Sequence, residues 1–149
     1  MPGIKSIFYS NYILRLKSLI LWPMITRVLL IDDDRDEHEI FSHALNRYNN
    51  NLSCVTATSC TEGFFLAKEQ KPDVIFLDMN MPNTNGTVCL RKLRTAEFLK
   101  NIPIYIYSAA TYSEKEKIVF DIGAKDWIKK PGTFEGYKKI FSKYLNGSI

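Results

Sequence analysis

The stretch RVLLIDDD, residues 27–34, sets a short apolar run directly before three consecutive aspartates. Three more apolar runs lead to polar residues in the same way: DVIFLDMN (73–80), IPIYIYSAA (102–110) and DWIKKP (126–131). Apolar residues follow one another in these runs without alternation, as is typical of strands that helices cover on both faces. The four runs therefore predict strands of a parallel sheet, and ligands bind beyond the carboxyl ends of such strands.

A fifth strand and a set of helical segments complete the pattern. The β-branched run LSCVTATS (52–59) is interpreted as the second strand in chain order. Helical periodicity follows each strand, in residues 34–50, 60–70, 86–100, 113–123 and 133–147. Parallel strands need crossover connections, and the right-handed crossover leaves few topologies. We therefore expect an α/β fold, a flavodoxin-like doubly wound five-stranded parallel sheet with strand order 2-1-3-4-5.

Length and composition indicate a single domain. A chain of 149 residues with 46% hydrophobic residues can fill one core. The net charge is +4, yet three of the 20 basic residues and none of the 16 acidic ones lie in residues 1–26. The remainder is therefore close to neutral and lacks the basic surface that nucleic-acid binding requires. We predict no direct contact with nucleic acid.

Residues 1–23 differ in composition from the rest and are interpreted as an N-terminal extension, with the domain expected at residues 24–149. Polar and basic side chains interrupt this segment, unlike a transmembrane helix of about 20 apolar residues or a secretory signal. Two interpretations remain. The segment is an interfacial helix that lies on a membrane or on a partner, or it is not part of the working protein and translation starts at Met24.

The three cysteines, Cys54, Cys60 and Cys89, are odd in number and have no paired metal-ligand spacing. Cys54 and Cys89 lie inside apolar patterns and are interpreted as small buried hydrophobic residues. We expect no disulfide bond. A chain without a disulfide framework is typical of the reducing cytoplasm, so a cytoplasmic location is predicted.

Five polar side chains stand at the predicted strand ends: the carboxylates of Asp32, Asp33 and Asp78, the hydroxyl of Ser108 and the ammonium of Lys130. Because parallel strands share one carboxyl edge, these groups should converge there from four separate stretches of sequence. Clustered carboxylates repel one another unless a cation neutralises them, and Mg²⁺ prefers oxygen ligands, phosphate oxygens among them. The constellation suits a Mg²⁺ ion and a phosphoryl group.

The runs VLLIDDD and IFLDMNMPNTNG, the Ser-Ala pair after the fourth strand and the Lys-Lys-Pro after the fifth resemble a known family. It is the receiver domain of bacterial two-component response regulators, the CheY-like family, and the resemblance covers about residues 26–146. It implies a phosphoacceptor signalling domain of a two-component phosphorelay. Such a domain is not an enzyme and shows at most slow self-dephosphorylation.

The resemblance also assigns roles to the acidic residues. Asp78 is implied to be the phosphoacceptor, a carboxylate nucleophile that forms an acyl phosphate. Asp33 and Asp78 would be direct ligands of Mg²⁺, and the backbone carbonyl of Asn80 would be a third. Asp32 would act on the ion through a water molecule, and Asp34 is interpreted instead as the cap of the following helix.

Further roles follow for the last two strands. Lys130 would hold the phosphoryl oxygens, while its neighbour Lys129 should point the other way because strand side chains alternate. Ser108 would move inward to donate a hydrogen bond to the phosphoryl group. Trp127 occupies the position of the switch aromatic, whose ring would turn inward when Ser108 shifts. The family implies a cis bond between Lys130 and Pro131.

The resemblance implies two kinds of partner. A sensor histidine kinase or a phosphotransfer protein would supply the phosphoryl group. A downstream target protein would dock on the face formed by the helix at 113–123, the strand at 126–131 and the helix at 133–147. Because the chain ends after that helix, we expect a stand-alone receiver. The two histidines, His38 and His43, are interpreted as solvated helix residues away from the strand ends.

Two other functions remain as alternatives. A phosphorylation-independent pseudo-receiver would act only as a binding module, but it would lack some acidic or lysine positions and none is missing here. An aspartyl-phosphate hydrolase of the haloacid-dehalogenase type needs a second aspartate two residues after its nucleophile. That position is Asn80, which argues against a hydrolase.

Overall fold

The computed structural model describes residues 24–146, and residues 1–23 and 147–149 lie outside the described part. The interpretation of residues 1–23 as an extension therefore stays a prediction, as does the domain boundary at Met24. Within the described residues, no helix is both long enough and apolar enough to cross a membrane.

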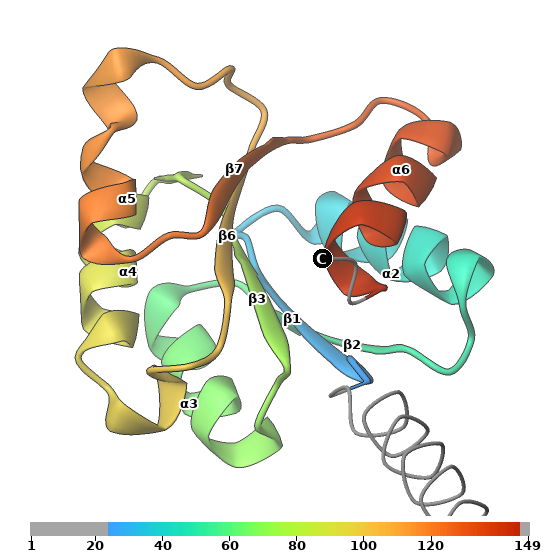
Figure 1. The fold of residues 1–149 in the computed structure, drawn as a ribbon, viewed down its shortest axis with the longest axis horizontal. Helices are drawn as coiled ribbons and strands as arrows, with labels where there is room; N and C mark the ends of the chain where they lie inside the picture. Colours follow the sequence, from blue (N-terminus) through green and yellow to red (C-terminus); the bar gives the residue numbers. More distant parts are fainter. Residues whose placement is uncertain (1–23, 147–149) are drawn as a thin grey trace, which may run out of the picture.

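A five-stranded parallel sheet forms the centre of the molecule (Figure 1). Its strand order is β2-β1-β3-β6-β7. When only the five strands of this sheet are numbered in chain order, this is the predicted order 2-1-3-4-5, and the predicted fold class is confirmed. Aliphatic residues fill the central strands because both faces are covered; β3, for example, is the fully buried run VIFL. The strands are β1 (Arg27–Ile31), β2 (Ser53–Ala57), β3 (Val74–Leu77), β6 (Ile104–Ser108) and β7 (Asp126–Lys129).

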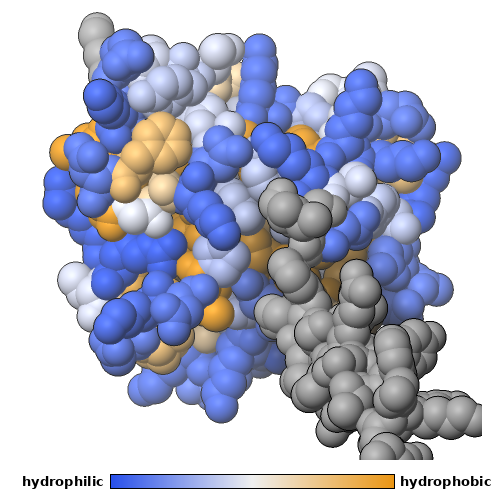
Figure 2. Space-filling model, in the orientation of Figure 1, coloured by the Kyte–Doolittle hydropathy of each residue, from blue (hydrophilic) through white to orange (hydrophobic). Residues whose placement is uncertain are grey.

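Helices cover the two faces of the sheet. Helices α2 (Arg35–Tyr48) and α6 (Phe134–Leu145) lie on one side, and α3 (Cys60–Gln70), α4 (Gly86–Arg94) and α5 (Ile118–Ile122) lie on the other (Figure 1). Side chains alternate along each strand, so Leu29 and Ile31 pack under one helical layer and Val28 and Leu30 under the other. Hydrophilic side chains cover most of the surface seen in Figure 2, with hydrophobic areas between them.

Two of the predicted helices are shorter than expected. The segment 86–100 forms α4 and then, after Thr95, a single 3₁₀ turn, η1 (Glu97–Leu99). The segment 113–123 forms another 3₁₀ turn, η2 (Glu114–Glu116), followed by the short helix α5. Ser113 and Glu116 form a capping box, and it caps the 3₁₀ turn. The loop after β3 contains a small hairpin of β4 (Asn80–Met81) and β5 (Thr84–Asn85).

A disulfide bond joins Cys60 and Cys89, so the expectation of no disulfide was wrong. Cys60 is the first residue of α3 and Cys89 lies one turn inside α4, and their Cα atoms are 5.6 Å apart. The two residues belong to helices that pack on the same face, a proximity that their separation of 29 residues does not reveal. Cys54 is free, and burial raises the pKa of its thiol to about 11.

The bond between Lys130 and Pro131 is trans, as are the other peptide bonds of residues 24–146, so the cis prediction was wrong. The trans form is intrinsically favoured even before proline. The backbone N–H of Lys130 donates to the carbonyl of Ser108 (2.8 Å), which extends the β6–β7 pairing to the residue before the proline.

Candidate functional site

Three carboxylates meet at the carboxyl edge of the sheet. Asp32 and Asp33 follow β1 and Asp78 follows β3, and the pairing of Ile31 with Leu77 brings the two strand ends level. One carboxylate oxygen of each aspartate lies within 4.8 Å of the others. Asp32 and Asp78 are buried, with 0% and 4% of their surface exposed, whereas Asp33 faces solvent. The predicted acidic cluster therefore forms, with one open side.

Lys130 reaches into this cluster from the end of β7. Its Nζ lies 2.7 Å from Oδ2 of Asp32, which accepts a hydrogen bond from it, and 3.7 Å from Oδ1 of Asp78. Lys129 is exposed, as the alternation of strand side chains predicts. A single ammonium thus faces two buried carboxylates and the exposed one beside them, which leaves the cluster short of positive charge.

The electrostatic environment shifts two pKa values. Burial, assisted by the nearby charges of Asp32 and Asp33, raises the pKa of Asp78, although Lys130 opposes the shift. Burial by itself would lower the pKa of Lys130, but its hydrogen bond to Asp32 and the charges of Asp32 and Asp78 raise it above the ordinary value. Lys130 is therefore a fixed positive charge near neutral pH.

Ser108 and Asn80 complete the set predicted from the sequence. Ser108 is fully buried at the end of β6, and its Oγ accepts a hydrogen bond from the backbone N–H of Ala110 (3.2 Å). The amide Nδ2 of Asn80 lies 3.5 Å from the same oxygen. Ser108 thus stands between the Asp78 loop and the loop that follows β6.

The donor set fits Mg²⁺. Three carboxylates from two neighbouring strands offer oxygen ligands, the kind that Mg²⁺ prefers, and Asp33 leaves one side open to water. One lysine does not balance three negative charges, so a divalent cation would relieve their mutual repulsion.

Trp127 lies on β7 beside this set, with its side chain partly buried. Its indole Nε1 donates a hydrogen bond to the carbonyl of Ala110 (3.1 Å), and its ring packs edge-on against Tyr112 with 5.7 Å between centroids. The indole therefore contacts the loop that follows Ser108 at two residues, Ala110 and Tyr112. This placement is compatible with a switch role, which stays a prediction.

His38 lies closer to the site than expected. Its Nε2 is 2.6 Å from the backbone carbonyl of Asp32, so the interpretation as a residue away from the strand ends was wrong. Helix α2 starts at Arg35, and its first turn therefore directs position 38 back toward the end of β1. His43, farther along the same helix, is exposed as predicted.

A group of polar residues next to Lys130, formed by two buried tyrosines and the half-buried Glu37, was missed by the sequence reasoning. The hydroxyls of Tyr107 and Tyr137 both donate to Oε1 of Glu37, at 2.6 and 2.8 Å. Tyr107 occurs in an apolar strand run and Tyr137 on the apolar face of a helix, where each is most simply interpreted as a core residue. The position of Tyr107 directly before Ser108 was the only sequence signal.

Comparisons with known proteins agree with this geometry. Residues 28–141 match the family of response regulator receiver domains. The probable C4-dicarboxylate response regulator DctR of Bacillus subtilis (strain 168) is 31% identical over 118 residues, which are 79% of this chain and 51% of that protein. The sensory transduction protein LytT of the same organism is 27% identical, over 79% of this chain and 47% of that protein.

The chain spans about half the length of these curated relatives. Among solved structures, the chemotaxis protein CheY4 of Vibrio cholerae aligns with a TM-score of 0.72 and 28% identity, over 81% of this chain and 99% of that one. The sequence match, the sheet topology and the acidic site therefore agree. The chain belongs to the family of response regulator receiver domains of two-component signalling systems.

Proposed function

We propose that this domain accepts a phosphoryl group on Asp78 and passes the signal on by protein–protein contact. The observation that carries the proposal is the contact of Lys130 with both Asp32 and Asp78 at the carboxyl edge of the sheet. A buried carboxylate next to a fixed ammonium and two further acids is suited to phosphoryl transfer, in which charge on the transferring group must be stabilised.

In the proposed reaction, a carboxylate oxygen of Asp78 attacks the phosphorus atom of a phosphorylated histidine or of a small acyl phosphate. A P–O bond to Asp78 forms while the bond from phosphorus to the leaving nitrogen or oxygen breaks, and its electron pair departs with the leaving group. Lys130 donates hydrogen bonds to the phosphoryl oxygens, and the hydroxyl of Ser108 donates another.

Asp33, Asp78 and the backbone carbonyl of Asn80 would hold Mg²⁺ directly, with Asp32 acting through a water molecule. When bound, the ion would offset the negative charge of the carboxylates and of the phosphoryl oxygens. Asp32 also orients Lys130 through its 2.7 Å hydrogen bond, so that the ammonium already lies at the site before the phosphoryl group arrives.

The proposed donor is a sensor histidine kinase or a phosphotransfer protein. A cytoplasmic location is proposed from the family alone, because the Cys60–Cys89 disulfide removes the argument from cysteine usage. The proposed output face consists of the segment 113–123, with η2 and α5, together with β7 and α6, and it exposes Ile118, Phe120 and the lysines at 117 and 129. Membrane contact is part of the proposal only if residues 1–23 form an interfacial segment.

Intact-mass measurement tests the phosphoacceptor. Incubation with Mg²⁺ and acetyl phosphate should add one phosphoryl group to the full chain, and Asp78→Ala should abolish the gain. Asp121→Ala serves as the matched control, because Asp121 is an exposed aspartate on α5. A phosphoryl group that still appears on the Asp78→Ala protein, or that forms without Mg²⁺, contradicts the assignment.

A further inference from the structure

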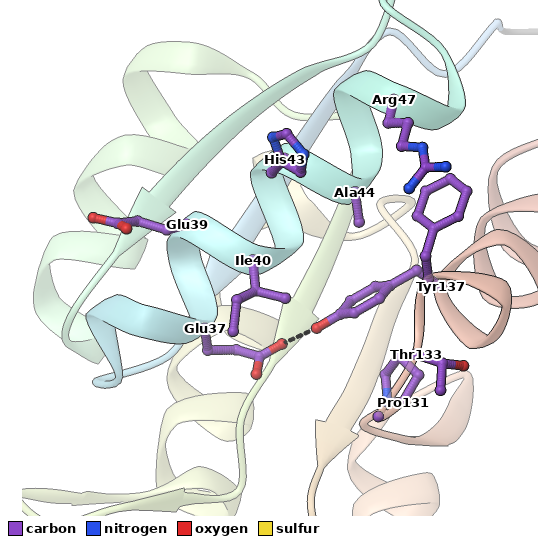
Figure 3. A pocket seen from close by; sticks show the side chains of 11 residues that line it. Glu37, Glu39, Ile40, His43, Ala44, Arg47, Pro131, Thr133 and Tyr137 are labelled. Carbon is purple, nitrogen blue, oxygen red and sulfur yellow. Dashed lines mark hydrogen bonds between the residues drawn. The ribbon is translucent and has the colours of Figure 1, made fainter.

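A network of three polar side chains, two buried tyrosines and a half-buried glutamate, lies behind Lys130. Glu37 comes from α2, Tyr107 from β6 and Tyr137 from α6, and both tyrosine hydroxyls donate to the same carboxylate oxygen. Tyr107 is fully buried and Tyr137 is 4% exposed. The bond between Glu37 and Tyr137 is drawn in Figure 3. The network ties the two helices of one layer to the strand that ends at Ser108.

This network also touches Lys130. The Nζ atom of Lys130 lies 5.5 Å from the ring centroid of Tyr107, within the range in which an ammonium is attracted to an aromatic face. The charge of Glu37 acts on the same ammonium: it helps to raise the pKa of Lys130, against burial and after the larger influences of Asp32 and Asp78. Lys130 therefore has two carboxylates in front of it, and a ring fixed by a third carboxylate behind it.

We propose that Tyr107 and Glu37 are positioning residues for Lys130. The ring of Tyr107 limits where the ammonium can lie, and the hydrogen bond to Glu37 fixes the ring. The inference rests on the proposed function, because it concerns the lysine that is to bind the phosphoryl oxygens.

The physical reason is the flexibility of lysine. Its long side chain has many rotamers and loses conformational entropy when it is held in one position. The hydrogen bond to Asp32 is one constraint, but it should weaken when the ammonium turns its N–H groups toward a phosphoryl group on Asp78. The ring of Tyr107 is a second contact that does not compete with the phosphoryl group. It keeps the ammonium close to its target while the first contact is exchanged.

Glu37 lies where this arrangement meets solvent. A groove of about 770 Å³ between α2 and α6 is lined by Glu37 and Tyr137, with Ile40 and Arg47 farther along it (Figure 3). Arg47 lies 3.9 Å from the ring centroid of Phe134. The network therefore extends from this groove to Lys130, and substitutions at its two ends should have the same effect on the lysine.

The neighbouring residue Tyr105 supplies a matched control. It lies two positions earlier on β6, points to the same face of the sheet and is 7% exposed. Its ring packs against Tyr144 with 4.7 Å between centroids. Among the described residues it makes no hydrogen bond or cation–π contact with Lys130 or Glu37. Replacing either tyrosine with leucine removes a buried ring from the same layer, but only Tyr107→Leu removes the contact with the lysine.

The test uses the full chain with Mg²⁺ and two readouts: the rate of phosphorylation at saturating acetyl phosphate and the dissociation constant of beryllofluoride, which mimics the phosphoryl group. Tyr107→Leu should lower the rate and weaken beryllofluoride binding at least fivefold, while Tyr105→Leu should stay within twofold of the wild type. Tyr107→Phe keeps the ring and should recover part of the loss. Glu37→Gln should weaken beryllofluoride binding at least twofold.

Several outcomes would overturn the inference. Wild-type behaviour of Tyr107→Leu would do so, as would an equal loss in Tyr105→Leu, which would trace the effect to general core packing. If Tyr107→Leu does not fold, the inference is also overturned when Tyr107→Phe and Glu37→Gln both bind beryllofluoride with unchanged affinity. A wild-type chain that neither gains a phosphoryl group nor binds beryllofluoride would contradict the proposed function as well. Failure confined to the variants contradicts only the positioning roles.

Discussion

At the scale of single residues, hydrogen bonds and ion pairs offset the cost of burying the carboxylates of the site. Asp32 is fully buried, yet it accepts hydrogen bonds from the backbone N–H of Asp34 and from Lys130. Asp78 is nearly as buried, and its closest cation lies 3.7 Å away. Asp78 is thus the less compensated of the two, in agreement with its proposed role as the nucleophile.

The first prediction concerns the stability of the metal-free protein. Burial raises the pKa of Asp78, so its favourable contribution to folding is present below the ordinary pKa of 3.8 and is lost as the pH rises through the raised value. Asp78→Asn cannot lose a proton. With EDTA present, the variant should therefore match the wild type near pH 3.5 and exceed its Tm by about 2–8 °C at pH 7.

Thermal unfolding across this pH range is the measurement, and Asp121→Asn, an exposed aspartate on α5, is the control that should show no such trend. Excess Mg²⁺ should reduce the difference at pH 7, because the ion relieves the repulsion in the wild type. If Asp78→Asn is less stable than the wild type at pH 7 without metal, the Asp78 carboxylate of the wild type is well compensated.

The sequence allowed some of these residues to be found and not others. Asp78, Ser108 and Lys130 each end an apolar run, so the strand pattern alone places them at one edge of the sheet. The contact of His38 with Asp32 depends on the rotation of α2 relative to β1. The network around Glu37 depends on two helices meeting a strand across long separations in sequence, information that no local pattern contains.

At the scale of elements, the start of α4 is pressed against the loop that contains Asp78 and Met79. Gly86 is the first residue of α4, and its backbone N–H donates to the carbonyl of Met79 (3.2 Å). A Cβ atom at position 86 would lie 2.6 Å from Cα of Met79 and 3.0 Å from the carbonyl oxygen of Asp78. Glycine therefore permits this close approach of helix and loop.

The second prediction follows from that contact. Gly86→Ala should lower the free energy of unfolding by about 1–3 kcal/mol, because backbone atoms must move to admit the methyl group. Gly132→Ala is the matched control, since nothing lies within 4 Å of the added Cβ atom there, and its stability should not fall. Urea unfolding of both variants is the measurement. Equal stability of the two variants would mean that the loop at Asp78 and Met79 shifts to admit the methyl group with little loss of folding free energy.

The disulfide between α3 and α4 leads to the third prediction. Closing a loop over a separation of 29 residues should stabilise the domain by about 3–4 kcal/mol through the entropy of the unfolded chain. A reducing agent should therefore lower the urea midpoint of the wild type and leave that of a Cys60→Ser, Cys89→Ser double variant unchanged. Cys54→Ser should respond to reduction as the wild type does.

Thiol counting checks the covalent bond itself. Denatured protein should react at one cysteine, Cys54, before reduction and at three afterwards. Three reactive thiols before reduction would contradict the cross-link. The sequence predicted both helices, at 60–70 and 86–100, but not their contact. Helix boundaries alone say nothing about which turns of α3 and α4 face each other.

At the scale of the whole molecule, the fold was predictable because the apolar strand runs are both its strongest sequence signal and the simplest one to detect. Strands buried on both faces are continuous apolar runs such as VIFL in β3, and parallel pairing then demands crossover helices. The weaker signals failed where tertiary contacts decide. The segment 113–123 has helical periodicity, but it turns through η2 before a helix of only five residues, Ile118–Ile122, forms. This irregular segment is part of the proposed output face.

The last prediction concerns how the occupied site alters that face. The indole of Trp127 is held by its hydrogen bond to Ala110 and by the ring of Tyr112. A phosphoryl group at Asp78 would draw the hydroxyl of Ser108 toward it, and a hydrogen bond to such a charged group contributes about 1.5–3 kcal/mol. Ala110 also donates its N–H to that hydroxyl, so the loop that holds the indole should move with it.

Fluorescence of the full-length Trp22→Phe protein isolates this step, because the chain has two tryptophans and only Trp127 then remains. Beryllofluoride with Mg²⁺ should shift the emission to the blue and protect it from acrylamide, since the ring moves from partial exposure into the space behind Ser108. An added Ser108→Ala substitution should suppress the shift while beryllofluoride still binds. If the emission of the Trp22→Phe protein does not change although beryllofluoride binds, Trp127 is static and the signal leaves the site by another route.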